Sequence, residues 1–377
     1  MTSSITLSAG VRQNLLALQK TAELMSVTQN RLATGKRVNS ALDNPTNYFT
    51  AASLSARASD LGKLLDAMGN AVKTLEAADN GISSLTKLVE SAQAIARQAQ
   101  QSAATTARVT GTVAGLTASS SFAVAADNTI TISDGTTTAT ITSTGNVTAQ
   151  DIVDGVNNTA NLNIRASLTS DGKILLEATD DTSTIVVGGT ATAAEKAQFG
   201  LVDGTTAAGT LNTTRQTLAA QFDDIRRQID QIAKDSGYNG VNLLNGAGLK
   251  VVFNESGTSS LTLTGVIFDT AGLSISASAN DFQTDYDINN ALDDLSTALG
   301  TLRAQASAFG ANLTVVQTRQ DFTKSMINTL QTGADALTLA DTNEEAANLL
   351  ALQTRQQLST TALSLAAQAD QNVLRLF

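Results

Sequence analysis

The chain has 377 residues, contains no Cys, His or Trp, and carries a formal net charge of −10. The missing Cys excludes disulfides and thiolate chemistry, and the missing His excludes Ser-His-Asp triads and His-ligated zinc. The acidic balance argues against nucleic acid as a partner. No apolar run reaches the roughly 18 residues that a transmembrane helix needs, so we expect no membrane insertion. The first ten residues lack the pattern of a secretory signal, which indicates a cytoplasmic location unless a dedicated exporter reads other signals.

Two helices are predicted in the first hundred residues. Residues 11–33 carry an apolar stripe and end at Thr34-Gly35, where glycine can adopt the left-handed cap. After an irregular link over 35–50, a longer helix over about 51–103 is expected. Gly62, Gly69 and Gly81 lie beside its apolar stripe and lower its helix propensity. The stripe of the first helix consists of Leu15, Leu18, Ala22, Met25 and Leu32. That of the second includes Leu61, Leu65, Met68, Val72, Leu75, Ala78, Ile82, Leu85, Val89, Ala92, Ala96 and Ala99.

The Thr/Ser/Gly-rich middle of the chain has the alternation of strands. Residues 129–133 and 137–142 flank Asp134-Gly135, and residues 164–168 and 173–178 flank Asp171-Gly172; both are hairpin signals. Residues 148–158 between them indicate a short helix with Thr148 as its N-cap. The order is therefore two strands, a helix and two strands, in a compact α+β unit over about 108–212.

Helical periodicity returns after residue 213. A helix is expected over 213–236, followed by strand-like segments over 249–254, 260–267 and 273–277 that suggest a β-hairpin. A heptad pattern then predicts a long helix over about 288–331, and a last helix over about 340–374. Steps of three and four residues in the long helix select Leu292, Leu295, Leu299, Leu302, Ala306, Phe309, Leu313, Val316, Gln320, Thr323, Ile327 and Leu330. Such a seam needs a partner helix, which the N-terminal segments can supply.

No group of residues in the chain indicates catalysis. Acidic pairs such as Asp223-Asp224 and Asp293-Asp294 are neighbours in predicted helices, where adjacent side chains point apart, so we interpret them as solvated faces. Gly188-Gly189 lacks the strand–GxGxxG–helix context of a nucleotide site. We therefore predict no enzyme, no metal and no cofactor. The sequence instead favours a mainly α architecture: an elongated coiled-coil rod of paired N- and C-terminal helices, a β-hairpin on it, and a small ββαββ insert.

Three segments resemble those of bacterial flagellins. Residues 30–41, NRLATGKRVNSA, are similar to the segment of that family that joins its terminal helix to the rod. Residues 238–244, YNGVNLL, are similar to the family's turn, and residues 368–376, QADQNVLRL, to its terminus, although Phe377 is an unusual last residue. The resemblance covers about 1–105 and 213–377, with the three motifs in the family's order.

This resemblance implies a subunit that assembles with copies of itself, and with other flagellins, into the extracellular flagellar filament. It further implies an export chaperone, the flagellar type III exporter, and filament cap and hook-associated proteins as partners. The corresponding segments would be an inner-core helix and link (1–44), a rod helix (45–107), an outer insert (108–212), a second rod helix and hairpin (213–287), a C-terminal rod helix (288–335) and a C-terminal inner-core helix (336–377).

Stripes and motifs together name the residues that we expect to matter. For filament assembly these are Leu15, Leu18, Met25, Arg31, Leu32, Asn39, Leu358, Leu365, Val373 and Leu376. For the core of the rod they are Leu75, Ile82, Leu85, Val89, Phe222, Ile225, Ile229, Leu295, Leu299, Leu302, Phe309, Leu313 and Val316.

The resemblance also has one departure. Many flagellins carry two arginines and a leucine that animal Toll-like receptors contact, and these fall here at Ala94, Ala96 and Gln98. Because cationic contacts are missing, we predict weak receptor activation.

Three alternative functions stay open at the level of sequence. A hook–filament junction protein shares the terminal architecture but forms a short adaptor ring. A coiled-coil adhesin would need an export signal, and an enzyme would need a catalytic insert. The motifs over 30–41 and 238–244 favour flagellin over all three.

Overall fold

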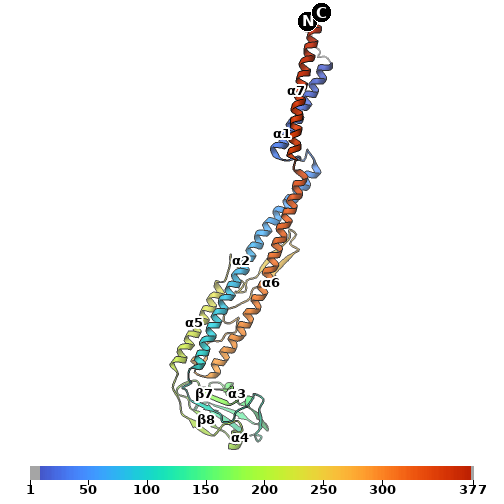
Figure 1. Ribbon diagram of the computed structural model, residues 1–377. Coiled ribbons are helices and arrows are strands. Elements are labelled where there is room, and N and C mark those ends of the chain that lie inside the picture. Colours follow the sequence, from blue (N-terminus) through green and yellow to red (C-terminus); the bar gives the residue numbers. More distant parts are fainter. Residues whose placement is uncertain (1–8, 375–377) are drawn as a thin grey trace. The chain divides into compact units, whose positions relative to one another are not determined.

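The computed structural model describes residues 9–374, apart from the side chains of Asp370 and of residues 372–374 (Figure 1). The chain divides into two compact units. The first, here called the terminal unit, comprises Met1–Gly69, Val252–Leu261 and Gln317–Phe377. The second, the central unit, comprises Asn70–Val251 and Thr262–Val316. The fold is mainly helical, with small antiparallel sheets, as the sequence predicts.

Two helices from opposite ends of the sequence lie side by side in the terminal unit. They are α1 (Ala9–Thr34) and α7 (Thr342–Leu374) (Figure 1). Helix α1 ends where the sequence predicts, because Gly35 takes a φ of +66°. The residues that follow α1 pair with those that precede α7: the N–H of Arg37 donates to the carbonyl of Thr338 at 2.7 Å, and that of Ala340 to the carbonyl of Gly35 at 3.0 Å.

The two longest helices are α2 (Pro45–Gln101) and α6 (Asp285–Thr338), and each runs through both units. Pro45 occupies the first helical position of α2, where its missing N–H costs nothing, and the side chain of Asn44 accepts the N–H of Asn47 at 3.1 Å. In the terminal unit α2 packs on α6 through Ala58, Leu61 and Leu330.

The long helix predicted over about 51–103 is confirmed, and α2 is continuous through Gly62, Gly69 and Gly81. Gly81 allows a close approach in the central unit. A Cβ at this position would lie 2.4 Å from Ser236 Oγ and 2.6 Å from Leu244 Cδ1. Around it, α2 and α6 pack with α5 (Thr213–Asp235). The buried side chains of this bundle include Leu75, Ile82, Leu85, Val89, Phe222, Ile229, Leu295, Leu299, Leu302, Phe309 and Val316, whereas Ile225 and Leu313 are partly exposed.

The segment between α2 and α5 contains both predicted hairpins. Strands β3 (Thr129–Ser133) and β4 (Thr138–Thr142) pair with Ile130 opposite Ile141, and β6 (Ile164–Leu168) and β7 (Ile174–Ala178) pair with Ala166 opposite Leu176. Between them lies α3 (Ala149–Asn157), with the predicted N-cap at Thr148. Further elements of this segment are β1 (Arg108–Thr110), β2 (Ser121–Ala123), β5 (Asn146–Thr148), β8 (Ile185–Gly188), α4 (Ala193–Ala197) and β9 (Gly204–Thr206).

The two hairpins do not share one sheet. One sheet has the strand order β4-β3-β8-β9 and another the order β1-β7-β6, while β2 pairs with β5. An apolar core that includes Ile132, Ile152, Ile164 and Phe199 holds these layers together. The predicted ββαββ order is thus present, and strands from both ends of the segment extend it. Figure 1 shows this layered part at one end of the central unit's helices.

After α5, strands β10 (Leu249–Val252) and β11 (Ser260–Leu263) form the predicted hairpin. The strand expected over 273–277 is wrong. Leu273 is buried in a turn, its N–H donates to the carbonyl of Asp269, and Ser274 takes a φ of +56°. A short 3-10 segment, η1 (Ala279–Phe282), leads from this turn toward α6.

Candidate functional site

The contact face between α1 and α7 is only partly apolar. On α1 it contains Val11, Thr21 and Thr28, which are buried, and Leu18 and Met25, which are partly buried. The facing positions of α7, at spacings of three and four residues, are Leu352, Gln356, Ser359 and Leu363, all partly buried. Leu349, at the same spacing, is also partly buried. The seam is therefore a mixture of apolar and polar side chains, and further leucines lie outside it.

The outward faces of the same two helices expose these apolar residues. On α1, Leu16 is 66% exposed, Leu24 43% and Val27 42%. On α7, the leucines at 350, 358 and 365 recur at nearly heptad spacing on one face and are 66%, 67% and 62% exposed. Burying one leucine fully is worth about 2 kcal/mol. A row of such side chains on a helix surface marks a contact surface.

The residues predicted for filament assembly lie in three kinds of place: in the seam, on the exposed faces of the helices, and in contacts within the chain. Leu18 and Met25 lie in the seam, whereas Leu15, Leu32, Leu358 and Leu365 are exposed. Arg31 and Asn39 make contacts within the chain, described below. Leu376 and the side chain of Val373 lie outside the described residues. Leu16, Leu24, Val27 and Leu350 were missed, because the periodicity was assigned to a single stripe on each helix.

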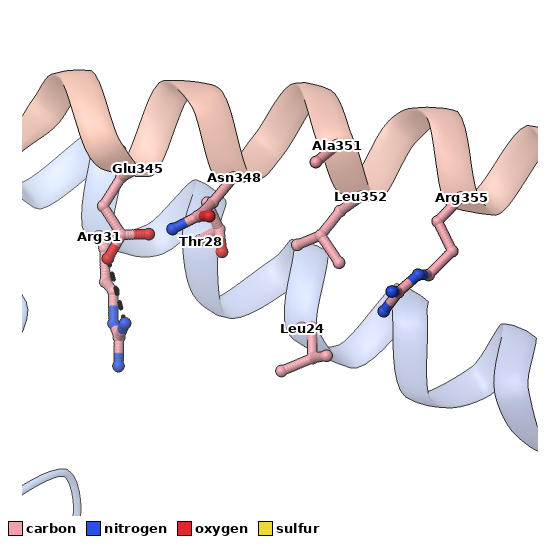
Figure 2. Close-up of a pocket in the computed structure, with 8 residues that line it drawn as sticks. All are labelled: Leu24, Thr28, Arg31, Glu345, Asn348, Ala351, Leu352 and Arg355. Carbon is pink, nitrogen blue, oxygen red and sulfur yellow. Dashed lines mark hydrogen bonds and ion pairs between the residues drawn. The ribbon is translucent and has the colours of Figure 1, made fainter.

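A groove runs along one flank of the helix pair (Figure 2). Arg31 and Glu345 close one end, where Arg31 Nη1 donates to Glu345 Oε1 at 3.1 Å. Leu24 and Leu352 supply apolar surface in the middle. Arg355 marks the other end, where its exposed guanidinium makes no hydrogen bond or ion pair with any described residue. The groove thus combines an apolar floor with an uncompensated positive charge.

The link between α1 and α2 is held by one carboxylate. Asp43 Oδ2 accepts the N–H groups of Asn39 and Ser40, each at 2.9 Å. These backbone hydrogen bonds lower the pKa of Asp43. Asn39 Nδ2 also donates to the carbonyl of Lys36 at 3.1 Å, so in this chain Asn39 stabilises the link itself. Leu42 projects from the link with 96% of its surface exposed, and Phe49 in α2 is 63% exposed.

A buried ionic network connects the sheet part of the central unit with its helices. Arg215, on the first turn of α5, is 1% exposed. Its Nη2 donates to Asp285 Oδ1 at 2.7 Å and to the carbonyl of Ser102 at 2.8 Å, and its Nη1 to the carbonyl of Gln283 at 2.9 Å. One cation therefore joins α5, the end of α2 and the start of α6.

Glu177, on β7, belongs to the same network and is also fully buried. Its Oε2 accepts the N–H of Asp285 at 2.7 Å, but its Oε1 has no hydrogen-bond partner and lies 3.7 Å from Arg108 Nε. Burial, together with repulsion from Asp285, raises the pKa of Glu177 to about 7. The attraction of Arg108 and Arg215 and the Asp285 N–H oppose this change without reversing it.

The three receptor-related positions differ in their surroundings. Ala94 and Gln98 are exposed on α2, whereas Ala96 is fully buried in the bundle. Any receptor contact at this part of α2 therefore concerns Ala94 and Gln98. Across residues 9–374, no group of three or more acidic side chains could hold a metal ion. None of the helices in this range is long and apolar enough to cross a membrane.

Comparisons with known proteins identify both ends of the chain. Residues 9–117 match the family model of the bacterial flagellin N-terminal helical region, and residues 292–377 match that of the C-terminal helical region. Together the two models cover just over half of the chain. The segment that carries β2 to β9 and α5 lies between the matched regions.

Several curated proteins are similar to this chain. Flagellin FljM of Caulobacter vibrioides is 33% identical over 170 residues, which are 44% of this chain and 62% of that protein. A flagellin of Brucella melitensis is 31% identical over 189 residues, 45% of this chain and 65% of its own length. Flagellin A of Rhizobium meliloti is 39% identical over 80 residues, 21% of this chain and 20% of that protein. The chain thus spans less than two thirds of the length of each of these relatives.

Proposed function

The chain belongs to the bacterial flagellin family, and from this premise we propose that it is a structural subunit that polymerises with copies of itself into the flagellar filament. The observation that carries the proposal is the surface of α1 and α7. Their seam mixes apolar side chains with Thr, Ser and Gln, and further leucines recur on their outward faces. Such helices gain most of their burial from neighbouring molecules, and repeated contacts between different faces produce an open helical assembly.

Location and further partners follow from the same proposal. A filament subunit acts outside the cell and reaches that site through the flagellar exporter, with an export chaperone before secretion and cap and hook-associated proteins at the two filament ends. Two further exposed residues, Leu42 in the link and Phe49 in α2, are candidates for subunit contacts as well. A mechanical role needs no catalytic group, so the proposed subunit is not an enzyme.

Truncation tests the proposal directly. We expect the chain lacking residues 340–377 to stay soluble and to retain the helices of the central unit, but to form no filaments when seeds or a precipitant are added. Electron microscopy measures filament length, and circular dichroism checks the fold. A truncated chain that still polymerised would contradict the role of α7. Short rings from the full chain would favour a junction protein over a filament subunit.

A point variant separates the surface from the helix itself. Replacing Leu358 and Leu365 by Asn removes two of the three exposed leucines on the outward face of α7 without changing the seam. Replacing Gln353 and Ser364 by Asn on the opposite exposed flank of α7 is the matched control. The first pair should abolish seeded growth and the control pair should not. Equal growth of both would show that the stripe does not form a subunit contact.

A further inference from the structure

The charges of the α1–α7 pair are few, and among its described side chains only Arg31 and Glu345 pair with each other. Helix α1 contains a single acidic residue, Glu23, and α7 a single basic residue, Arg355. Both are exposed, and neither makes an ion pair or hydrogen bond with a described residue. Arg31 and Glu345, by contrast, neutralise each other inside the pair. Glu23 and Arg355 are thus opposite charges on different helices and, like Arg12, Lys20 and Glu344, have no side-chain partner among the described residues.

Glu23 lies on an apolar ridge that is turned away from α7. Leu16 precedes it by seven residues and Val27 follows by four, so the three share one side of α1. The seam residues, among them Thr21 and Thr28, lie on the other side. Lys20, one turn before Glu23, has a side chain long enough to keep its ammonium group in water when the ridge is covered.

Arg355 lies at the open end of the groove, beside the apolar surface of Leu24 and Leu352 (Figure 2). The two surfaces are therefore chemically complementary. The ridge presents two apolar side chains and a carboxylate, and the groove presents two apolar side chains and a guanidinium. Because they lie on different sides of the same helix pair, they cannot meet within one molecule. A contact between them joins two copies head to tail and repeats without closing.

We propose that the ridge of one copy, Leu16, Glu23 and Val27, fits into the groove of the next copy and that Glu23 there pairs with Arg355. The inference rests on the proposed filament function and names the contact that this function uses. Glu344, another exposed and unpaired acid among the described side chains of the pair, lies in the polar first turn of α7 beside Asp341 and Asn343. An exposed guanidinium that becomes covered needs such a carboxylate, since an unpaired buried charge strongly weakens association.

Charge reversal tests the contact. We expect Glu23→Arg and Arg355→Glu, each alone, to raise the critical concentration for seeded growth about tenfold or more, because each places like charges together. Glu344→Arg, the matched control, should change it little. Circular dichroism of each monomer verifies that the helices remain.

Mixing the two single variants decides whether the pairing is between molecules. In an equimolar mixture, Glu23 of one variant meets Arg355 of the other, and Arg at 23 meets Glu at 355 in the next contact. The mixture should therefore form filaments that neither variant forms alone, and the double variant should also recover.

Other outcomes would overturn the inference. Normal growth of either single variant, or failure of both the mixture and the double variant, would exclude this pair as the contact. Loss of growth in Arg355→Glu with normal growth in Glu23→Arg would mean that the groove takes a different acid. Wild-type protein that forms no filaments would overturn the proposed function, and this contact with it.

Discussion

Glu177 gives the central unit a stability that depends on pH near neutrality. Its pKa rises from 4.5 in the unfolded chain to about 7 in the folded protein, because the carboxyl group is buried. Between these values the folded protein holds a proton that the unfolded chain has released. Raising the pH through this window therefore lowers the free energy of unfolding, by about 3 kcal/mol in total at ~1.4 kcal/mol per tenfold change. Below pH 4.5 this stabilisation is fully present, and above about pH 7 it is gone.

The composition isolates this effect. The chain has no His and no Cys, so no other side chain ordinarily titrates between pH 5 and 7. Asp134 and Glu195 have pKa values lowered to about 2. For Asp134, the N–H groups of Asn163 and Thr137 outweigh the opposing effect of burial. Because a lowered pKa stabilises above the unfolded value, their contributions are lost only in more acidic solution, outside the window.

Urea unfolding of dilute monomer at pH 5, 6, 7 and 8 measures how the free energy of unfolding changes with pH. We expect the free energy of unfolding to fall from pH 5 to 7 and then to level off. In Glu177→Gln the amide oxygen keeps an acceptor for the N–H of Asp285 but no longer titrates, so the curve should be nearly flat. Glu90→Gln, on an exposed position of α2, should retain the wild-type slope. A wild-type curve that is flat or rises with pH would mean that Arg108 and Arg215 outweigh burial.

Three further outcomes follow from packing and charge. Gly81→Ala should lower stability by about 1–3 kcal/mol, since its Cβ has no room, whereas Gly62→Ala, with no atom within 4 Å, should raise it by about 0.5–1 kcal/mol; thermal unfolding compares them. Arg215→Met removes this donor from the carbonyls of Ser102, Phe282 and Gln283 and from the partly buried carboxylate of Asp285, which keeps Arg108, and should cost about 3 kcal/mol in urea. In a Toll-like receptor reporter assay, the protein should activate weakly, and Ala94→Arg with Gln98→Leu should activate more strongly; strong wild-type activation would refute this.

The parts of the fold that the sequence predicts are those set by near neighbours. The turns at Asp134-Gly135 and Asp171-Gly172 both have a glycine with positive φ, 96° at Gly135 and 69° at Gly172. Each also has a nearby side-chain acceptor, since the Asp134 carboxylate accepts the N–H of Thr137 and the Thr169 hydroxyl accepts that of Lys173. The side chain of Thr148 caps α3 by accepting the N–H of Asp151, three residues later in the chain. The pairing of β3 with β8 brings together Thr131 and Gly188, residues far apart in the chain, and nothing local specifies it.

Gly81 shows the opposite kind of limit. Helix propensity argues against glycine in α2. At this position, however, Ser236 and Leu244 from another part of the chain pack so closely that only a residue without a Cβ fits. Likewise, the buried charges of Arg215 and Glu177 carry no local signal, since each has its partners on distant elements. Sequence periodicity identifies the buried face of a helix well where all of its partners belong to the same molecule. The buried Leu75, Ile82, Leu85 and Val89 of α2 are an example.

The terminal helices show why periodicity is a weaker guide at an assembly surface. A heptad stripe states which residues prefer to leave water, but it does not state whether their partner belongs to the same molecule. In α1 the apolar residues surround much of the helix, and the chain's own α7 covers the side with Val11, Thr21 and Thr28. In α7 the predicted stripe of Leu358 and Leu365 is turned outward. A single copy thus satisfies the helices' backbone and leaves several of their leucines exposed. In the proposed filament subunit, these exposed residues would supply the driving force for association, because they would lose their water only on contact with another copy.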